Sequence, residues 1–323
     1  RFISRHRDLF RRRAAEGWIR DVHGDLHCEH VCFAPEGIEI YDVIEFSPKL
    51  RQCDLASEIA FFLMDLEVRG GGALAPAFLD RYLELVEDSE LSVLLLYYKC
   101  YRALVRGKVE AMRAQLADDR ASPYFRYAAR ITWEPLKPFL VMVCGLTGSG
   151  KSILARQLGD SLGTPVINSD TVRKQLAGES GRNIAPFEQG IYSQPMTEET
   201  YLEMTREAEE QVLTGGGAIL DATFSRRANR ERVLGLAKKH GVPLAVIHCS
   251  ASDETTRKRL AQRAEEGKDI SDGRWEIYGR QKEAYEPMEE IPAESRLELN
   301  TEADVEQLAG VALSFVRSRI EQT

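Results

Sequence analysis

The chain has 323 residues, of which 43% are hydrophobic and 29% charged, and its formal net charge at pH 7 is −8. This length predicts two domains that can bury cores without disulfides or metals, and the composition excludes a disordered chain and a coiled coil. The acidic balance argues against binding nucleic acid through bulk charge. No apolar run is long enough to span a membrane.

Cysteine usage indicates the compartment. The six cysteines are scattered, and no two form a C-x-x-C pair. No apolar signal region follows the Arg-rich opening, so we expect a reducing, cytoplasmic location. The chain begins at Arg1 instead of a methionine, and we expect it to be part of a longer protein.

Helical patterns dominate the chain before the linker. Residues 91–116 contain no proline and have apolar residues at helical spacing, which predicts one long helix. Shorter helices are predicted at 61–64 and 78–86. Only residues 31–33 and 38–44 are predicted to be strands, with a Pro-Glu-Gly turn between them.

Two prolines within residues 134–138 predict a short, stiff linker. After it, predicted strands alternate with predicted helices. The strands are 139–144, 165–168, 218–221 and 244–249, and the helices are 152–162, 198–213, 227–240 and 253–266. Strands separated by helices indicate a parallel sheet covered on both faces. The predicted fold class is therefore α/β: a mainly parallel, doubly wound sheet in 139–323, preceded by a mostly α-helical region in 1–133.

Residues 145–152 read GLTGSGKS and fit the phosphate-loop pattern G-x-x-x-x-G-K-[ST]. Glycines let consecutive N–H groups turn toward an anion, and the start of the next helix adds partial positive charge. We expect ATP or GTP here, with Lys151 on the β- and γ-phosphates and the Ser152 hydroxyl on Mg²⁺. The alternative is a glycine-rich turn without a ligand. The expected nucleotide-binding residues are Gly145, Thr147, Gly148, Ser149, Gly150, Lys151 and Ser152.

Asp170 and Arg173 follow the second strand of this region, where the carboxyl ends of parallel strands form a ligand crevice. One helical turn separates them, so their side chains share a face. The Asp can orient and deprotonate a hydroxyl while the Arg holds a negatively charged acceptor. The alternative is a helix-capping Asp with an ordinary ion pair.

Two further candidates complete the predicted site. Asp221 ends a buried strand and could hold Mg²⁺ through water, contact the acceptor or cap a helix. Arg257, Arg259 and Arg263 lie on a predicted helix before a polar stretch. Such a segment can close as a lid and bring an arginine to the transferring phosphoryl group. Arg263 is the best candidate, and a solvated helix surface is the alternative.

The region from 139 to about 287 resembles the P-loop kinases that include polynucleotide 5′-hydroxyl kinases, zeta toxins and chloramphenicol phosphotransferases. The resemblance rests on GLTGSGKS, on the Asp170-x-x-Arg173 spacing, on LDATF with the following RR-x-x-R, and on the Arg-rich predicted helix. It implies that Asp170 is the general base and that Arg173 contacts the acceptor side. Residues 177–200 match none of these families closely, and 190–193 and 200–201 are expected to line the acceptor pocket.

We therefore predict an ATP- and Mg²⁺-dependent kinase. It would transfer the γ-phosphoryl group to a hydroxyl of a small molecule or of a polynucleotide 5′ end, with Lys151, Asp170, Arg173 and Arg263 as catalytic residues. The alternative is a nucleotide-sensing regulatory module in which ATP binding changes how the two domains dock.

Residues 23–32 read HGDLHCEHVC and hold three His and two Cys, which suggests zinc, although the spacings do not form a standard pair of knuckles. HGDLH instead resembles the catalytic loop of aminoglycoside and choline phosphotransferases. There the Asp matching Asp25 positions the substrate hydroxyl, and an Asn at the place of His30 holds Mg²⁺. Glu45 stands at the other metal-binding position of this family. Residues 54–56, which begin with Asp54, read DLA and match a later D-L-A motif of the family.

The resemblance implies that 1–133 is the carboxy-terminal lobe of a kinase-like fold without its nucleotide-clamping lobe, serving as a scaffold or acceptor platform. Imidazole is a poorer Mg²⁺ ligand than a carboxamide. Activity of the Asp25, His30 and Glu45 site in a longer protein therefore stays open. The Arg-rich opening is either a nucleic-acid patch or a solvated helix face.

Overall fold

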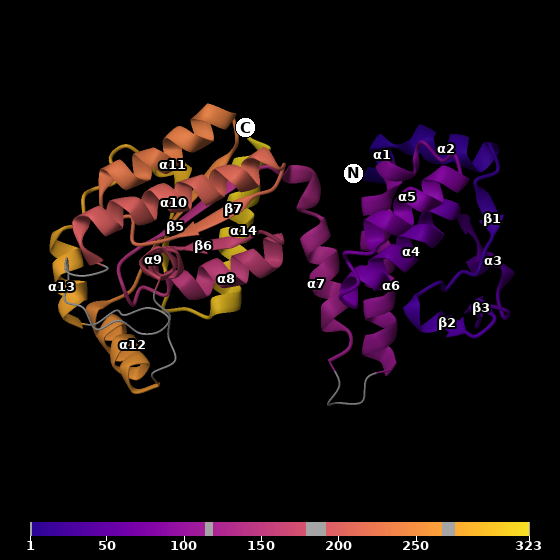
Figure 1. Ribbon diagram of the computed structural model, residues 1–323, viewed down its shortest axis with the longest axis horizontal. Helices are drawn as coiled ribbons and strands as arrows, with labels where there is room; N and C mark the ends of the chain where they lie inside the picture. Colours follow the sequence, from indigo (N-terminus) through magenta and orange to yellow (C-terminus); the bar gives the residue numbers. More distant parts are fainter. Residues whose placement is uncertain (1, 114–118, 179–191, 267–274, 323) are drawn as a thin grey trace. The chain divides into compact units, whose positions relative to one another are not determined.

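The computed structural model describes residues 2–113, 119–178, 192–266 and 275–322 (Figure 1). The chain forms two compact units, residues 1–134 and residues 135–323, and each is described by itself. Among the described residues, no helix combines the length and apolar character needed to cross a membrane.

Unit 1, residues 1–134, is mostly helical. Its helices are α1 (Phe2–Arg5), α2 (Arg7–Ala15), α3 (Pro48–Arg51), α4 (Leu55–Val68), α5 (Ala75–Leu85), α6 (Leu91–Arg113) and α7 (Ser122–Ile131), with 3₁₀ turns η1 (Cys28–His30) and η2 (Glu134–Leu136). Two antiparallel pairs join them: β1 (Ile19–Asp21) with β4 (Gln52–Asp54), and β2 (Val31–Ala34) with β3 (Gly37–Ile40). Helix α4 packs on α5 and α6, and α6 packs on α7.

The structure confirms the long helix over Leu91–Arg113, and residues 114–118 lie outside the described part. The strand predicted at 38–44 is too long. It ends at Ile40 because Asp42 has a φ of 64°, a left-handed conformation that a continuing strand does not adopt. The pair β1 and β4 was not predicted, since three residues are too few to show an alternating pattern.

A buried ion network ties the first helices of unit 1 together. Arg13 of α2 is fully buried, and its guanidinium donates to both carboxylate oxygens of Asp54 at 2.7 and 2.8 Å. It also donates to both oxygens of Asp88 at 2.6 and 2.7 Å. Asp54 is in addition the N-cap of α4, accepting from the Ala56 amide at 2.9 Å. One arginine therefore pairs with two buried carboxylates from distant parts of the chain.

Unit 2, residues 135–323, is the predicted α/β fold. Its strands are β5 (Leu140–Cys144), β6 (Val166–Asn168), β7 (Ala218–Asp221), β8 (Leu244–Ser250) and β9 (Arg296–Asn300). Its helices are α8 (Lys151–Leu162), α9 (Ser169–Ala177), α10 (Gln194–Leu213), α11 (Arg227–His240), α12 (Asp253–Glu266), α13 (Trp275–Glu283) and α14 (Val305–Glu321), with a 3₁₀ turn η4 (Ala293–Ser295). All strand pairs are parallel, in the order β6-β7-β5-β8-β9.

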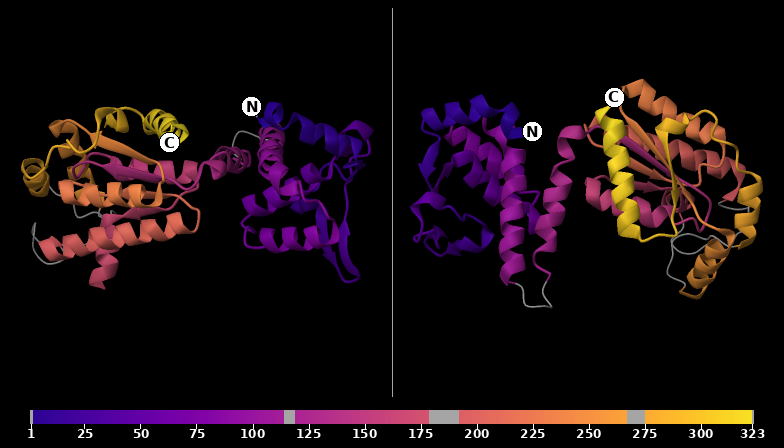
Figure 2. Two further views of the ribbon diagram at one scale, coloured as in Figure 1. Left: turned by 90° about the horizontal axis from the view of Figure 1, so that it is seen from above. Right: turned by 180° about the vertical axis from the view of Figure 1, so that it is seen from behind.

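The sheet lies between two helical layers. Helices α8 and α14 pack against each other on one face, and α10 and α11 pack on the other (Figures 1 and 2). The central strand β5 is buried at every residue. From β5 the chain winds to β6 and β7 on one side, and then returns past β5 to β8 and β9. The carboxyl end of β5 thus lies where the winding reverses, which is where open α/β sheets bind ligands.

Three elements of unit 2 escaped sequence analysis: α13, β9 and α14. In β9 the alternation of apolar and polar residues rests on Leu297 and Leu299 alone, which is too short a pattern to predict a strand. The strand lies at the edge of the sheet, where half of its residues need not be apolar. Strand β9 nevertheless has a role at the site, because the next residue, Thr301, contacts the phosphate loop.

The Arg13 network yields a stability prediction. We expect Arg13→Met to lower the free energy of unfolding by about 3–5 kcal/mol, because it leaves two buried carboxylates without a counter-charge. Methionine preserves much of the side-chain volume, so the loss reports charge more than packing. Urea unfolding followed by intrinsic fluorescence measures it, since Trp18 lies 4.7 Å from the Arg13 guanidinium.

The matched control is Arg12→Met. The Arg12 side chain is half exposed and pairs with Glu90 at the surface, so its substitution should lower the free energy of unfolding far less than that of Arg13. Equal effects of the two substitutions would show that the buried network is not what holds these helices.

Candidate active site

The phosphate loop, residues 145–152, joins β5 to α8. Gly145 and Gly148 have φ values of 141° and 77°, in the region that favours glycine. A Cβ on Gly145 would lie 2.2 Å from the carbonyl oxygen of Cys249, and one on Gly148 would lie 2.8 Å from Thr256. Both the backbone angles and the close neighbours therefore require the glycines that the motif supplies.

Two residues outside the motif, Thr301 and Arg259, contact backbone carbonyls of the loop. The Thr301 hydroxyl donates to the carbonyl of Ser149 at 2.6 Å. The Arg259 guanidinium donates to the Thr301 hydroxyl at 2.9 Å and to the Thr301 carbonyl at 2.6 Å, and lies 3.5 Å from the carbonyl of Gly148. Sequence analysis had placed Arg259 only in an arginine-rich helix, and no sequence signal singled out Thr301.

Helix α13 also contacts the loop. The backbone N–H of Thr147 donates to the side-chain carbonyl of Gln281 at 3.0 Å. The Ser149 hydroxyl is buried without a hydrogen-bond partner. A loop amide that faces a glutamine carbonyl is already oriented toward an oxygen acceptor, as phosphate binding requires.

One cavity joins the phosphate loop to the predicted acceptor side. It brings together five of the predicted site residues, Thr147, Lys151, Ser152, Asp170 and Arg173. The other lining residues are Asn168, Ser169, Tyr192, Gln194, Thr197, Tyr201, Thr223, Ser225, Arg226, Asn229, Ile277, Gln281 and Ala284. The walls therefore carry several hydrogen-bonding groups and two arginines.

Asp170 and Arg173 form an ion pair on this cavity, with 2.7 Å between Arg173 Nη1 and Asp170 Oδ1. Asp170 is not the helix cap that the alternative interpretation required. Asn168 caps α9, and its side-chain oxygen accepts from the amides of Asp170 and Thr171 at 3.0 and 3.1 Å. The Arg173 guanidinium also lies 4.9 Å from the Tyr192 ring centroid.

Asp221 lies at the end of β7 and is 2% exposed. One carboxylate oxygen accepts from the Asn168 amide at 2.7 Å. The other is buried and has no hydrogen-bond partner within the part of the chain that the structure describes. Asp221 does not itself line the cavity, whereas Ser152 and Asn168 do. An unpartnered carboxylate oxygen near the carboxyl end of β5, with the Ser152 hydroxyl on the cavity, suits the oxygen ligands that Mg²⁺ prefers.

A buried arginine shapes the opposite wall. Arg230 is fully buried and donates to the carbonyl of Phe224 at 2.9 Å while it pairs with Glu290. It thereby fixes the turn that carries Arg226 onto the cavity. The Phe224 amide donates to the Tyr201 hydroxyl at 3.0 Å, and burial raises the pKa of Tyr201 to about 12. Tyr201 thus stays neutral at physiological pH.

Two other predictions have mixed outcomes. Tyr192 and Tyr201 line the cavity as expected, but Thr200 is fully buried and donates to the carbonyl of Met196 at 2.7 Å, so it does not line the cavity. Residues 179–191 lie outside the described residues, as does the side chain of Arg263.

Parts of the chain are similar to known proteins. Residues 140–288 match the family model AAA_33, described as an AAA domain. An uncharacterized protein of Mycobacterium tuberculosis is 32% identical over 272 residues, which cover 81% of this chain and 54% of that protein. The chain thus spans about half the length of the curated relatives that cover most of it.

Shorter matches fall on named kinases. A shikimate kinase of Paracidovorax citrulli is 38% identical over 93 residues, covering 28% of this chain and 51% of that enzyme. Among solved structures, a gluconokinase from Sinorhizobium meliloti has a TM-score of 0.41 at 16% identity, covering 57% of this chain and 95% of that one. Residues 140–288 therefore form a P-loop kinase-like domain related to shikimate and cytidylate kinases.

Proposed function

We propose that this chain transfers the γ-phosphoryl group of ATP or GTP to a hydroxyl of a small molecule or of a nucleic-acid 5′ end. One observation carries the proposal: a single cavity holds both the phosphate-loop residues Lys151 and Ser152 and the Asp170–Arg173 ion pair. A nucleotide hydrolase or sensor needs only the first group. The second group supplies the base and the positive charge that an acceptor requires.

The nucleotide end is proposed to work by positioning and charge. The loop amides and Lys151 would hold the β- and γ-phosphates. Ser152 directly, and Asp221 through water, would hold Mg²⁺, which supplies neutralisation of the phosphate charge when bound. Arg259 and Thr301 would act as positioning residues, because they contact loop carbonyls and each other.

The acceptor end is proposed to work by proton removal. As the acceptor oxygen bonds to the γ-phosphorus and the bridging oxygen leaves with the nucleoside diphosphate, Asp170 would take the hydroxyl proton. Its ion pair with Arg173 orients the carboxylate. Arg173 and Arg226 both line the cavity, which favours an acceptor carrying a carboxylate or phosphate. Arg263 remains our proposed lid arginine for the transferring phosphoryl group.

We also propose that residues 1–133 derive from the carboxy-terminal lobe of an aminoglycoside-phosphotransferase-like fold, joined through 134–138 to the kinase domain at 139–323. The mostly helical architecture and the proximity of Asp25 to His30 support this. One expectation changes: the carboxylate beside His30 Nε2 is Asp42, at 3.2 Å, while Glu45 is exposed.

Lys151→Ala should abolish phosphoryl transfer, because it removes the point charge expected on the β- and γ-phosphates. The assay incubates the chain with γ-labelled ATP and shikimate, gluconate or a 5′-hydroxyl oligonucleotide, and follows label in the acceptor and in free phosphate. Lys258→Ala is the control, since Lys258 is largely exposed and forms an ion pair with Glu254 of the same helix. Nucleotide binding by the parent chain with neither transfer nor hydrolysis would favour a regulatory module.

Asp170→Asn should lower turnover by about 10²–10⁴-fold, as expected for loss of a general base. Nucleotide affinity, measured by calorimetry, should change little because Asp170 lies at the acceptor end. Asp160→Asn on the exposed part of α8 is the matched control. An Asp170→Asn chain that phosphorylates its acceptor at the parent rate would refute the base assignment.

A further inference from the structure

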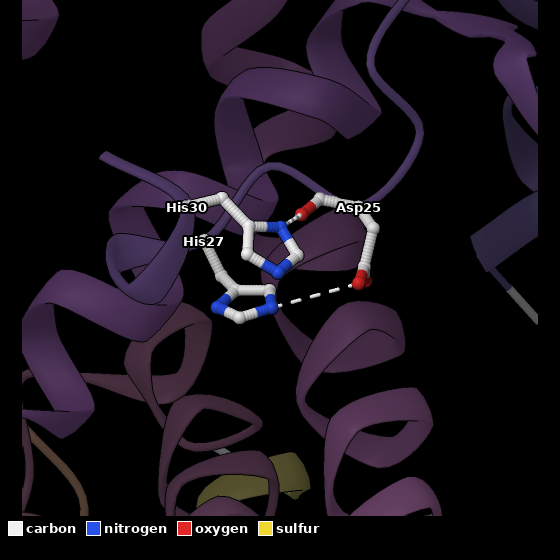
Figure 3. Close-up of side chains that lie close together, drawn as sticks. All are labelled: Asp25, His27 and His30. Atoms are coloured by element: carbon white, nitrogen blue, oxygen red, sulfur yellow. Dashed lines mark hydrogen bonds and ion pairs between the residues drawn. The ribbon is translucent and has the colours of Figure 1, made fainter. Parts of the chain in front are cut away.

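A second cluster of chemistry-bearing side chains lies in unit 1. Asp25, His27 and His30 come from the loop after β1 and from η1, and their side chains point toward one another (Figure 3). One donor atom from each lies within 4.8 Å of the other two. His27 Nε2 is 3.5 Å from Asp25 Oδ2, and the two imidazole ring centroids are 3.9 Å apart.

His27 is the observation that points to a ligand. It is 1% exposed, and among the described residues neither of its ring nitrogens has a partner within hydrogen-bond distance and geometry. Its nearest charged neighbours are Asp25 at 3.5 Å and Glu29 at 3.9 Å, both beyond good hydrogen-bond length. A buried polar group without a good hydrogen bond destabilises a fold, so an imidazole in this position favours a bound group.

His30 is oriented as metal-binding histidines are. Its Nδ1 donates to the backbone carbonyl of Asp25 at 2.9 Å, because a carbonyl oxygen can only accept. That bond fixes the tautomer and leaves the lone pair of Nε2 available in the neutral ring. Nε2 faces the carboxylate of Asp42 at 3.2 Å. A lone pair beside a carboxylate is repulsive unless a proton or a metal cation lies between them.

We propose that Asp25, His27 and His30 bind a divalent transition-metal ion of the zinc class, with at least one coordination position open to solvent. Zinc bonds of about 2.0–2.2 Å place tetrahedral donor atoms about 3.3 Å apart, close to the 3.5 Å between Asp25 and His27. Two imidazoles select such a metal over Mg²⁺, which prefers oxygen. The Asp25 side chain is 35% exposed, which gives the ion a path to the site.

The neighbouring residues define the limits of the site. His23 lies on the same loop, but its Nε2 contacts the Tyr41 carbonyl at 2.7 Å and its Nδ1 accepts from the Asp25 amide at 3.3 Å. Cys32 is exposed on β2 and lies outside the cluster. The sequence spacing did not match a standard zinc motif. In the structure, one carboxylate and two of the three histidines nevertheless lie close together, without a thiol.

Cobalt titration of the full chain tests the proposal. The purified chain is stripped with a chelator and titrated with Co²⁺, followed by its visible absorption, and Zn²⁺ is then added as competitor. We expect one Co²⁺ per chain, displaced by one Zn²⁺, and a higher Tm with Zn²⁺ bound. His27→Gln and His30→Gln should each weaken binding at least about tenfold, whereas His23→Gln should not.

Asp25→Asn keeps the test decisive if His27→Gln fails to fold, because Asp25 is partly exposed and the change preserves its size. It too should weaken Co²⁺ binding, with the circular dichroism spectrum unchanged. The proposal is overturned if the parent chain binds no Co²⁺ or Zn²⁺ stoichiometrically, if Asp25→Asn and His30→Gln bind as the parent does, or if His23→Gln loses as much affinity as they do.

Discussion

The nucleotide end of unit 2 depends on the close approach of two backbones, at Gly145 and Cys249. No side chain fits between them, so the chain can leave β5 only through a glycine at this point. The approach brings the phosphate loop against the end of β8. Arg259 of α12 and Thr301, the residue after β9, reach its carbonyls. The loop is therefore supported by two neighbouring strand ends as well as by its own sequence.

Sequence patterns predicted the centre of unit 2 well, because β5 and β7 are short apolar runs and the glycine motif has a fixed geometry. They could not predict that Arg259 contacts the loop instead of lying on a solvated helix face. Nor could they predict that Thr301, next to the edge strand β9, contacts the loop. Those contacts join residues up to 152 positions apart. Only the folded sheet brings such residues together, and no periodicity records it.

Unit 1 shows the opposite relation between sequence and structure. Its His-rich segment stood out in the sequence, but the spacing of its His and Cys residues did not match a standard zinc motif. Such spacing rules describe zinc knuckles and helices, and they do not describe a loop that ends in a 3₁₀ turn. Likewise, Arg13 belongs to an Arg-rich opening that reads as solvated. The structure buries it against Asp54 and Asp88. A buried charge is recognisable only when its partners are known.

The contact between Thr147 and Gln281 has a consequence for how a nucleotide enters. The loop amide is already satisfied by a protein acceptor, so an incoming phosphate oxygen competes with the glutamine instead of meeting a bare donor. The exchange replaces a neutral acceptor by an anionic one, which forms the stronger bond. It also frees the side chain that connects α13 to the loop. A phosphate bound at the Thr147 amide would therefore displace one contact between α13 and the loop, while the bonds of Tyr278 and Lys282 to Asp253 would still hold this helix.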